Sequence, residues 1–308
     1  MHDVIIIGGG PAGLTAGLYA GRYRLDTLLL EKAALGGQII MSSLIDNYPG
    51  FPGGISTSEL AGKMEKQARD TGIQVQNGEV LGFEPQPAGT GGGFKIKTAE
   101  NEYSARSVII ASGARWKLLG IPGEEKLVGR GVSFCATCDA PFFRNKEVVV
   151  VGGGDKAVEE AVFLTSYASR VTIIHRRKDL RATAIIQEKA RANPRINFIL
   201  DSVVDEVTGE SKVESVKVRN LITGQSGNVP CQGVFIFIGI SPLTGFIKNS
   251  LETDEAGFII TDNKMKSSLD GVFACGDCRQ KTLYQVVTAC GEAAQAAFSA
   301  HNYLLQSK

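Results

Sequence analysis

The sequence has almost no net charge. It contains 33 basic and 32 acidic residues in a chain of 308, which leaves a formal net charge of +1. No block of like charges forms a tail or a basic stripe, so the composition argues against nucleic acid as a partner. Any electrostatic binding must therefore be local to a site.

Long apolar runs are also absent. No stretch approaches the ~18 residues that a membrane helix needs. The apolar residues from Val4 to Ile7 enter a predicted core strand at once, which leaves no room for a signal peptide before them. We therefore expect a cytoplasmic protein without a membrane segment, with about two domains for this length.

Cysteine is too scarce and too unevenly spaced for the disulfide framework of a small secreted protein. The six cysteines are Cys135, Cys138, Cys231, Cys275, Cys278 and Cys290. Four of them form two Cys-x-x-Cys pairs, which is the ligand count of a structural zinc site. The separation of the pairs, 275 − 138 = 137 residues, is far longer than compact zinc modules use, so we predict no metal site.

A glycine-rich turn stands at the start of the chain. The predicted strand over Val4–Ile7 runs into the sequence Gly8-Gly9-Gly10-Pro11-Ala12-Gly13, which opens a predicted helix. Gly8 permits a tight turn, Gly10 lets the backbone approach a diphosphate, and Gly13 lets helix and strand pack closely. The helix N-terminus then faces the phosphate charge, which predicts a dinucleotide site.

The same pattern recurs 152 − 8 = 144 residues later. Gly152, Gly154 and Ala157 occupy the places of the three glycines, and the apolar residues 171–174 match residues 27–30 at the same offset. The repeat predicts an α/β fold with two Rossmann-like dinucleotide-binding domains.

The residues that end the second strand of each copy differ. Glu31 in the first copy can accept hydrogen bonds from an adenosine ribose, which suits FAD or NAD. The second copy has the sequence His175-Arg176-Arg177, with Arg181 close behind, and these cations can grip a 2′-phosphate, which favours NADP. The alternative is that the arginines form a solvated helix face.

The sequence Cys135-Ala136-Thr137-Cys138-Asp139 lies just upstream of the second glycine-rich turn. A dithiol beside a dinucleotide site indicates electron transfer between thiols and a nicotinamide. Thiol exchange requires a thiolate, and a nearby carboxyl group can protonate the sulfur that leaves. The alternatives are that the cysteines are small buried hydrophobes and that Asp139 is a turn or cap residue before Pro141.

Taken together, these motifs resemble the bacterial low-molecular-weight thioredoxin reductases from one end of the chain to the other. The most specific elements are Gly131 to Asp139, the two glycine-rich turns, the His175–Arg177 cluster with Arg181, Gly36-Gly37-Gln38, and Asp46 to Gly50.

The resemblance implies a relay in which NADPH reduces FAD, the flavin reduces a Cys135–Cys138 disulfide, and the dithiol reduces thioredoxin. In the family, the residue at Cys138 attacks and leaves the flavin C4a, and the residue at Cys135 attacks the partner disulfide. Asp139 is the acid/base candidate. By analogy with the family, the protein is expected to be a homodimer.

The resemblance also implies the ligands of both cofactors. A strand–Gly–Asp segment, Gly271 to Asp277, matches the segment whose aspartate binds the FAD ribityl and phosphate region. The expected FAD residues are Gly8, Gly10, Pro11, Ala12, Gly13, Glu31, Lys32, Gly36, Gly37, Gln38, Asn47, Gly113, Gly276, Asp277 and Gln285. The expected NADPH residues are Gly152, Gly154, Asp155, Ala157, His175, Arg176, Arg177 and Arg181.

Because the Gly271–Asp277 segment would return to the first domain, we expect a discontinuous FAD domain at 1–114 and 243–308. The NADPH domain, 115–242, would be inserted into it and would carry the dithiol. The two crossings would form a double-stranded hinge for a rotation between the domains. The glycine-rich run from Ala88 to Gly93 is expected to be a hairpin or surface loop.

Residues that flank the dithiol suggest a docking surface for thioredoxin, namely Arg130 upstream and Phe142-Phe143-Arg144 downstream. The alternative places both phenylalanines in the core of the strand that leads to Glu147. Successive side chains of a strand point to opposite faces, so at least one of the two phenylalanines is expected to be exposed and available for docking.

Tyr284 departs from the resemblance, because the family usually has arginine directly before the residue at Gln285. It puts the local charge in question. A disulfide between Cys275 and Cys278 is an alternative that we do not favour. Two other functions stay open: a related flavoprotein that reduces another disulfide or oxygen, and a non-catalytic nucleotide-sensing or zinc-binding protein.

Overall fold

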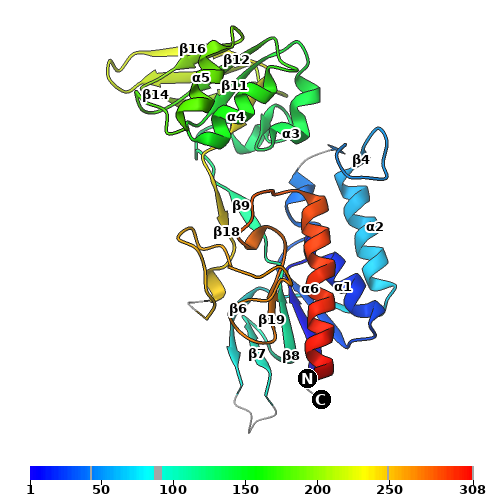
Figure 1. Cartoon of the computed structure of the whole chain (residues 1–308). Helices are drawn as coiled ribbons and strands as arrows, with labels where there is room; N and C mark the ends of the chain where they lie inside the picture. The colour runs from blue at the N-terminus through cyan, green and yellow to red at the C-terminus, as the bar shows by residue number, and fades with distance from the viewer. Residues whose placement is uncertain (42–43, 87–91, 248–249, 307–308) are drawn as a thin grey trace. The chain divides into compact units, whose positions relative to one another are not determined.

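The computed structural model of the chain describes residues 1–41, 44–86, 92–247 and 250–306. They form two compact units (Figure 1): Met1–Arg115 with Ser241–Lys308, and Trp116–Ile240. Each unit has its own sheet with helices packed on it; the sheet of the first unit is partly antiparallel and that of the second is parallel. The predicted fold class, two Rossmann-like domains of which one is inserted into the other, is confirmed.

The first unit is built on a seven-stranded sheet in the order β5-β2-β1-β8-β7-β6, with β19 beside β8. The strands are β1 (His2–Ile7), β2 (Thr27–Glu31), β5 (Gln74–Asn77), β6 (Val80–Pro85), β7 (Phe94–Thr98), β8 (Glu102–Ile110) and β19 (Val272–Ala274). The long strand β8 changes partner along its length, because its first residues pair antiparallel with β7 and its last pair parallel with β19. The C-terminal segment thereby completes the sheet begun by the N-terminus.

Both faces of β1 are buried, which explains its uninterrupted apolar sequence. Val4 and Ile6 belong to a hydrophobic cluster with the helices, whereas Ile5 and Ile7 belong to a cluster on the opposite face. The helices are α1 (Pro11–Arg22), α2 (Thr57–Arg69) and α6 (Val286–Gln306). In Figure 1, α6 runs alongside α1, and alanines on both helices allow this close approach.

Short elements complete the first unit. They are η1 (Gly37–Met41), β3 (Leu44–Ile45), β4 (Ile55–Ser56), η5 (Gly245–Ile247) and η6 (Gly276–Cys278). Ser56 begins α2 as its N-cap, since its hydroxyl accepts a hydrogen bond from the Glu59 N–H at 3.2 Å. The glycine-rich run predicted as a hairpin or surface loop lies largely outside the described residues; β6 and β7, which flank it, pair antiparallel.

The second unit has a five-stranded parallel sheet in the order β10-β17-β11-β12-β13 and a three-stranded antiparallel sheet, β14-β15-β16. The strands are β10 (Val132–Ser133), β11 (Glu147–Val151), β12 (Arg170–Ile174), β13 (Ile196–Ile199), β14 (Ser202–Thr208), β15 (Ser215–Asn220), β16 (Ser226–Pro230) and β17 (Gly233–Ile236). The helical segments are η3 (Glu125–Leu127), α3 (Ala136–Asp139), η4 (Ala140–Phe143), α4 (Asp155–Leu164) and α5 (Ala184–Ala192).

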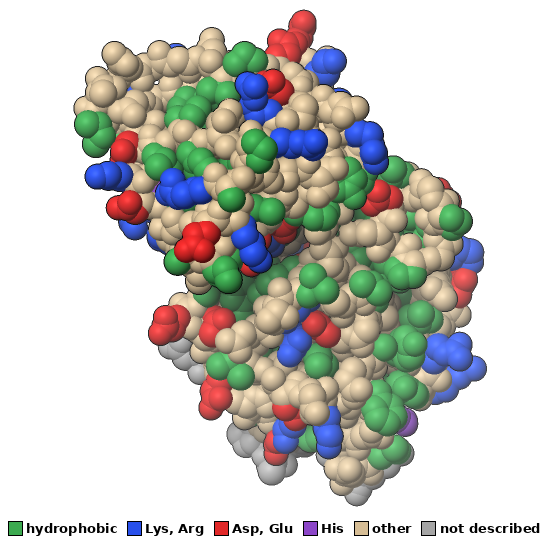
Figure 2. All heavy atoms as spheres, turned by 45° about the horizontal axis from the view of Figure 1, so that its top comes forward, with side chains coloured by type: hydrophobic (Ala, Val, Ile, Leu, Met, Phe, Trp, Pro, Cys, Tyr) green, Lys and Arg blue, Asp and Glu red, His purple; other side chains and the backbone are tan. Residues whose placement is uncertain are grey.

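The two segments that connect the units are β9 (Ala114–Trp116) and β18 (Ile240–Pro242), and they pair with each other as a two-stranded sheet. On the face shown in Figure 2, acidic and basic side chains are interspersed and form no patch of one sign.

Gly13 is a position at which the fold tolerates no side chain, because a Cβ atom there would collide with the carbonyl oxygen of Gly8. We expect Gly13→Ala to lower the free energy of unfolding by about 1–3 kcal/mol, the usual cost of overpacking. Gly62→Ala is the matched control, since Gly62 lies in α2 with open space around it and alanine favours a helix by about 0.5–1 kcal/mol. Urea unfolding of both variants tests this; equal stabilities would contradict the packing argument.

Candidate active site

The first glycine-rich turn joins β1 to α1. Gly8 has a φ of +109°, a conformation that favours glycine. Gly10 is the N-cap residue of α1, and no side chain caps the helix there. The N–H groups of the first turn are thus left for an anion, as a dinucleotide diphosphate requires.

Other predicted FAD residues gather around this turn. Glu31 ends β2, and its carboxylate accepts hydrogen bonds from the N–H groups of Gly9 at 2.6 Å and Ala33 at 2.9 Å. Gly37 approaches Gly10 so closely that a Cβ on Gly37 would lie 3.0 Å from the Gly10 Cα. Lys32 is exposed and instead pairs with Glu79 at 3.1 Å.

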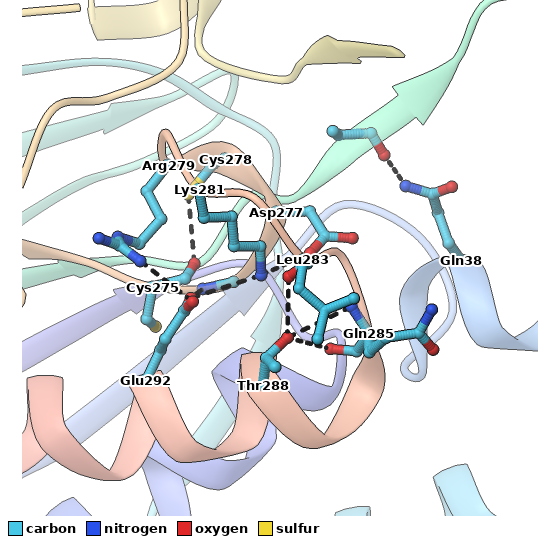
Figure 3. Close-up of polar contacts among 12 residues, drawn as sticks. Gln38, Cys275, Asp277, Cys278, Arg279, Lys281, Leu283, Gln285, Thr288 and Glu292 are labelled. Atoms are coloured by element: carbon cyan, nitrogen blue, oxygen red, sulfur yellow. Dashed lines mark hydrogen bonds and ion pairs between the residues drawn. The ribbon is translucent and has the colours of Figure 1, made fainter. Parts of the chain in front are cut away.

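Asp277 lies in η6, directly after β19, and Figure 3 shows it within a network of charged groups. The Lys281 ammonium lies 2.9 Å from an Asp277 carboxylate oxygen and 3.5 Å from Glu292, although its side chain is only 5% exposed. Glu292 also accepts from the Gly276 N–H at 2.8 Å and pairs with Arg279 at 3.0 Å. Two cations thus neutralise two carboxylates at this turn.

Gln38, Asn47, Gly113 and Gln285, which were also predicted to bind FAD, belong to the same unit. The Gln38 side-chain amide donates to the carbonyl oxygen of Ala114, and the Asn47 amide donates to the Gln285 side-chain oxygen at 3.1 Å. Gly113, which follows β8, has a φ of +72°.

Although Tyr284 replaces the arginine that the family usually has, a cation still lies beside it. The Lys281 ammonium lies 5.3 Å from the centre of the Tyr284 ring, within the range of a cation–π contact. Burial raises the pKa of the Tyr284 phenol, which keeps it neutral at physiological pH. Lys281 therefore supplies a positive charge beside the position where the family usually has arginine.

The second glycine-rich turn joins β11 to α4. Gly154 is the N-cap residue of α4, again without a side-chain cap. The Asp155 carboxylate accepts from the Thr183 N–H at 2.7 Å, so the start of α4 holds the segment that leads to α5. Ala157 is buried at the third residue of the helix.

His175 follows β12 and is only 5% exposed, with its ring packed against Gly153. Burial and the nearby Arg181 charge lower its pKa, so the imidazole is neutral at physiological pH. Among the described residues, its Nε2 atom has no hydrogen-bond partner. The Arg181 N–H donates to the Gly153 carbonyl oxygen at 2.6 Å, which places Arg181 at the turn.

Arg176, Arg177 and Arg181 lie between β12 and α5, in a segment that is not helical. The alternative that they form a helix face is wrong, because α5 begins only at Ala184. All three are exposed, and the backbone of Arg181 contacts the second turn.

Cys135 and Cys138 form a disulfide across α3, with Cα atoms 5.3 Å apart. Both residues are half-buried, so the alternative of two passive core cysteines is wrong. The Ser133 hydroxyl donates to the Asp139 carboxylate at 2.5 Å and accepts from the Cys135 N–H at 3.1 Å. Asp139 is thus tied to the loop that carries the disulfide, and its side chain makes no cap bond to η4.

Ser133 was not predicted from the sequence. Its contacts depend on the turn of α3, which brings a residue six positions upstream of Asp139 onto its carboxylate. The signal that could have indicated this role was a hydroxyl residue, Ser133, two residues before the Cys-x-x-Cys-Asp sequence.

The predicted docking surface is partly revised. Phe142 and Phe143 lie in η4, so the alternative of a strand is wrong, because Pro141 lacks the N–H that a ladder would need. Phe143 is buried against Phe235, with ring centres 5.1 Å apart, whereas Phe142 is 46% exposed. Arg130 and Arg144 are exposed.

The other cysteines are free thiols, so the alternative of a Cys275–Cys278 disulfide is not found. Burial raises the pKa of Cys278 to about 11 and that of Cys231 to about 12. Complete burial also raises the pKa of Cys275 well above its usual range. At pH 8 only about 10⁻³ of Cys278 would be thiolate, the reactive form.

We therefore expect iodoacetamide at pH 8 to alkylate Cys135 and Cys138 of the reduced, folded protein long before Cys231, Cys275 and Cys278. Mass spectrometry of digested samples measures each site, and unfolding in urea is the control that exposes all six thiols. Labelling of Cys278 as fast as Cys135 would contradict the burial argument.

No helix in the described part of the chain is long and apolar enough to cross a membrane. Over the same residues, no group of three or more His, Cys, Asp or Glu side chains is placed to hold a metal ion.

The pattern that defines the pyridine nucleotide-disulphide oxidoreductases matches residues 2–293. A thioredoxin reductase from Listeria innocua is 45% identical in an alignment of 310 positions, which covers 100% of this chain and 95% of the relative. The chain belongs to the thioredoxin reductases of the pyridine nucleotide-disulphide oxidoreductase family.

Solved structures agree with this family. The crystal structure of thioredoxin reductase from Streptococcus pyogenes is 45% identical, covers 100% of this chain and 99% of its own, and superposes with a TM-score of 0.94. The crystal structure of Lactococcus lactis thioredoxin reductase in its FR conformation is also 45% identical, covers 99% of this chain and 100% of its own, and has a TM-score of 0.68.

Proposed function

We propose that the chain is an NADPH-dependent flavoprotein that reduces the disulfide of thioredoxin. The observation that carries this proposal is the Cys135–Cys138 disulfide, which lies in the same unit as the second dinucleotide-type turn. The first unit supplies the other turn, so the chain holds the sites that a relay of electrons from nicotinamide to dithiol requires.

The residues of the first unit fit FAD. The open N-terminus of α1 at Gly10 suits its diphosphate, and Glu31 suits its adenosine ribose. Asp277, held by Lys281, is assigned to the ribityl and phosphate region, with the other predicted FAD residues around it. When bound, FAD takes up a hydride and passes electrons on to a disulfide.

The residues of the second unit fit NADPH. The start of α4 suits the diphosphate, since Gly152 and Gly154 keep side chains away from it. Arg176 and Arg177, with Arg181 and His175, are assigned to the 2′-phosphate, which distinguishes NADPH from NADH.

The Cys135–Cys138 dithiol then undergoes thiol–disulfide exchange with thioredoxin, and this exchange needs no further oxidant or reductant. The Cys135 thiolate attacks the thioredoxin disulfide, which forms a mixed disulfide and releases one thioredoxin thiolate. The Cys138 thiolate next attacks the Cys135 sulfur, which restores the Cys135–Cys138 bond and releases reduced thioredoxin. Asp139, held by Ser133, is assigned the proton transfer to the departing sulfur.

The docking surface for thioredoxin is assigned to Phe142, Arg130 and Arg144, which are exposed in the unit that carries the dithiol. An exposed aromatic ring near arginines is typical of a protein-binding patch.

The proposal also includes a rotation of one unit against the other. We further propose that the protein is a homodimer and that it is cytoplasmic. Paired crossings at β9 and β18 offer two strands about which the units can turn. A rotation is needed because the dithiol and the nicotinamide cannot occupy the same flavin face together.

The test is anaerobic oxidation of NADPH by the purified protein with insulin as the terminal disulfide. Rapid turnover only when a catalytic amount of thioredoxin is present supports the proposal. Equal turnover without thioredoxin, or turnover only with another disulfide, would instead support the related reductase that serves a different substrate.

Lys281 offers a test of the FAD assignment. We expect Lys281→Met to weaken FAD binding by about tenfold or more, because Asp277 and Glu292 would lose a buried ion-pair partner. FAD released on dialysis is measured by fluorescence, with Lys97→Met as the control, since Lys97 makes an exposed ion pair. Unchanged retention by Lys281→Met would contradict the role of this network.

A further inference from the structure

The only tryptophan of the chain stands in a column of three side chains within the second unit. The ring of Trp116 lies nearly parallel to that of Phe134, at 8°, with centres 6.1 Å apart. The Lys156 ammonium lies 5.3 Å from the Trp116 ring centre. These are the separations of offset stacking and of a cation–π contact. We call these three residues the Trp116 column.

The members of the column come from three segments that the proposed reaction uses. Trp116 ends β9, one of the two crossing strands, and Phe134 directly precedes Cys135. Lys156 is the second residue of α4, whose first turn faces the proposed diphosphate site. The column therefore connects the nucleotide turn with the loop of the redox disulfide.

Lys156 lies in the first turn of α4, where its positive charge does not stabilise the helix. A cation in the first turn of a helix is opposed by the positive end of the helix dipole. The Trp116 ring lies against this charge, and Lys156 lowers the pKa of Glu160, one turn further on, against the larger effect of burial. A diphosphate at the same helix end would attract Lys156 more strongly than the half-buried Trp116 ring does.

We propose that Lys156 is a positioning residue that exchanges the Trp116 ring for the diphosphate of the nicotinamide dinucleotide. The exchange removes the cation from the column and thereby couples nucleotide binding to the packing of Phe134 beside Cys135. The three side chains act on the loop that holds the reacting sulfurs, because Phe134 directly precedes Cys135. This inference rests on the proposed assignment of the second turn to NADPH.

Trp116 reports on the column directly, because the tryptophan emission of the protein comes from this ring alone. The probe is NADP⁺, which cannot reduce the flavin and does not absorb tryptophan emission. We expect NADP⁺ to change the emission of the oxidised holoenzyme saturably. Calorimetry on the same samples gives the NADP⁺ affinity independently of the optical signal.

Lys156→Met keeps most of the length of the side chain and removes its charge. We expect NADP⁺ to bind this variant about tenfold more weakly, the loss of one charge-assisted contact, with little emission change at saturation. The matched control is Arg191→Met, because Arg191 also lies over an aromatic ring of this unit, 5.2 Å from the centre of Phe198. The control should behave like the wild type.

Alkylation of Cys135 tests the coupling to the disulfide loop. After reduction, saturating NADP⁺ should change the rate of Cys135 alkylation by iodoacetamide in the wild type, and this change should be lost in Lys156→Met. The inference is overturned if calorimetry shows NADP⁺ binding while Lys156→Met keeps wild-type affinity, emission change and alkylation response. If the wild-type protein binds no NADP⁺, the proposed function fails and the inference fails with it.

Discussion

Cys138→Ser is expected to reduce the NADPH-dependent reduction of thioredoxin by at least about 10³-fold, because removal of a nucleophile abolishes the covalent route. Cys138 is the partner of Cys135 in the disulfide, and its sulfur must resolve the mixed disulfide that Cys135 forms. NADPH should still reduce the flavin of this variant, since the nucleotide turns are untouched. Steady-state turnover with thioredoxin and single-turnover flavin reduction measure the two effects separately.

Cys231→Ala is the matched control for this experiment. Cys231 is a buried free thiol in the second unit, among the apolar residues of its core. Its loss should leave turnover within about twofold, with at most a modest decrease in stability. Turnover of Cys138→Ser near the wild-type rate would show that the disulfide in α3 does not carry the electrons.

The double variant Arg176→Ala/Arg177→Ala is expected to lower kcat/KM for NADPH by about 100-fold. Each lost charge-assisted contact to a phosphate costs about 1.5 kcal/mol at the low end, and about 3 kcal/mol corresponds to a factor of about 100. NADH lacks the 2′-phosphate, so its kcat/KM should stay nearly constant. The preference between the two nucleotides should therefore collapse.

Arg191→Ala controls for the loss of positive charge from the same unit. Arg191 lies near the end of α5 and stacks over Phe198, not beside the second glycine-rich turn. Parallel assays with NADPH and NADH should give wild-type values for this variant. An unchanged NADPH affinity in Arg176→Ala/Arg177→Ala would show that the 2′-phosphate binds elsewhere.

Much of the fold could be predicted from local patterns. The apolar run at Val4–Ile7 predicted a buried strand, and β1 is buried on both faces because parallel strands carry helices and chain on either side. The glycines also predicted where the two turns lie. Gly8 and Gly152 have positive φ angles, and this requirement is a property of the backbone itself, so it can be recognised in the sequence.

Side-chain partners that depend on tertiary packing could not be predicted. Lys281, which follows η6, meets Glu292 of α6 only because η6 packs on α6, and no pattern in the sequence pairs the two residues. The alternative of a strand at Phe142 and Phe143 could not be excluded from the sequence, yet Pro141 and the packing of Phe143 on Phe235 favour a helical turn. The neutral, buried state of His175 likewise follows from its contact with Gly153, which lies 22 residues earlier.

The most direct test of the relay is anaerobic reoxidation of the reduced flavin. The holoenzyme is reduced with NADPH, mixed with oxidised thioredoxin, and followed through the visible absorbance of the flavin, with Cys138→Ser in parallel. The account predicts rapid reoxidation of the wild type by thioredoxin and none of the variant. A flavin that NADPH reduces but thioredoxin cannot reoxidise in the wild type would contradict the account and assign the protein to the reduction of another disulfide.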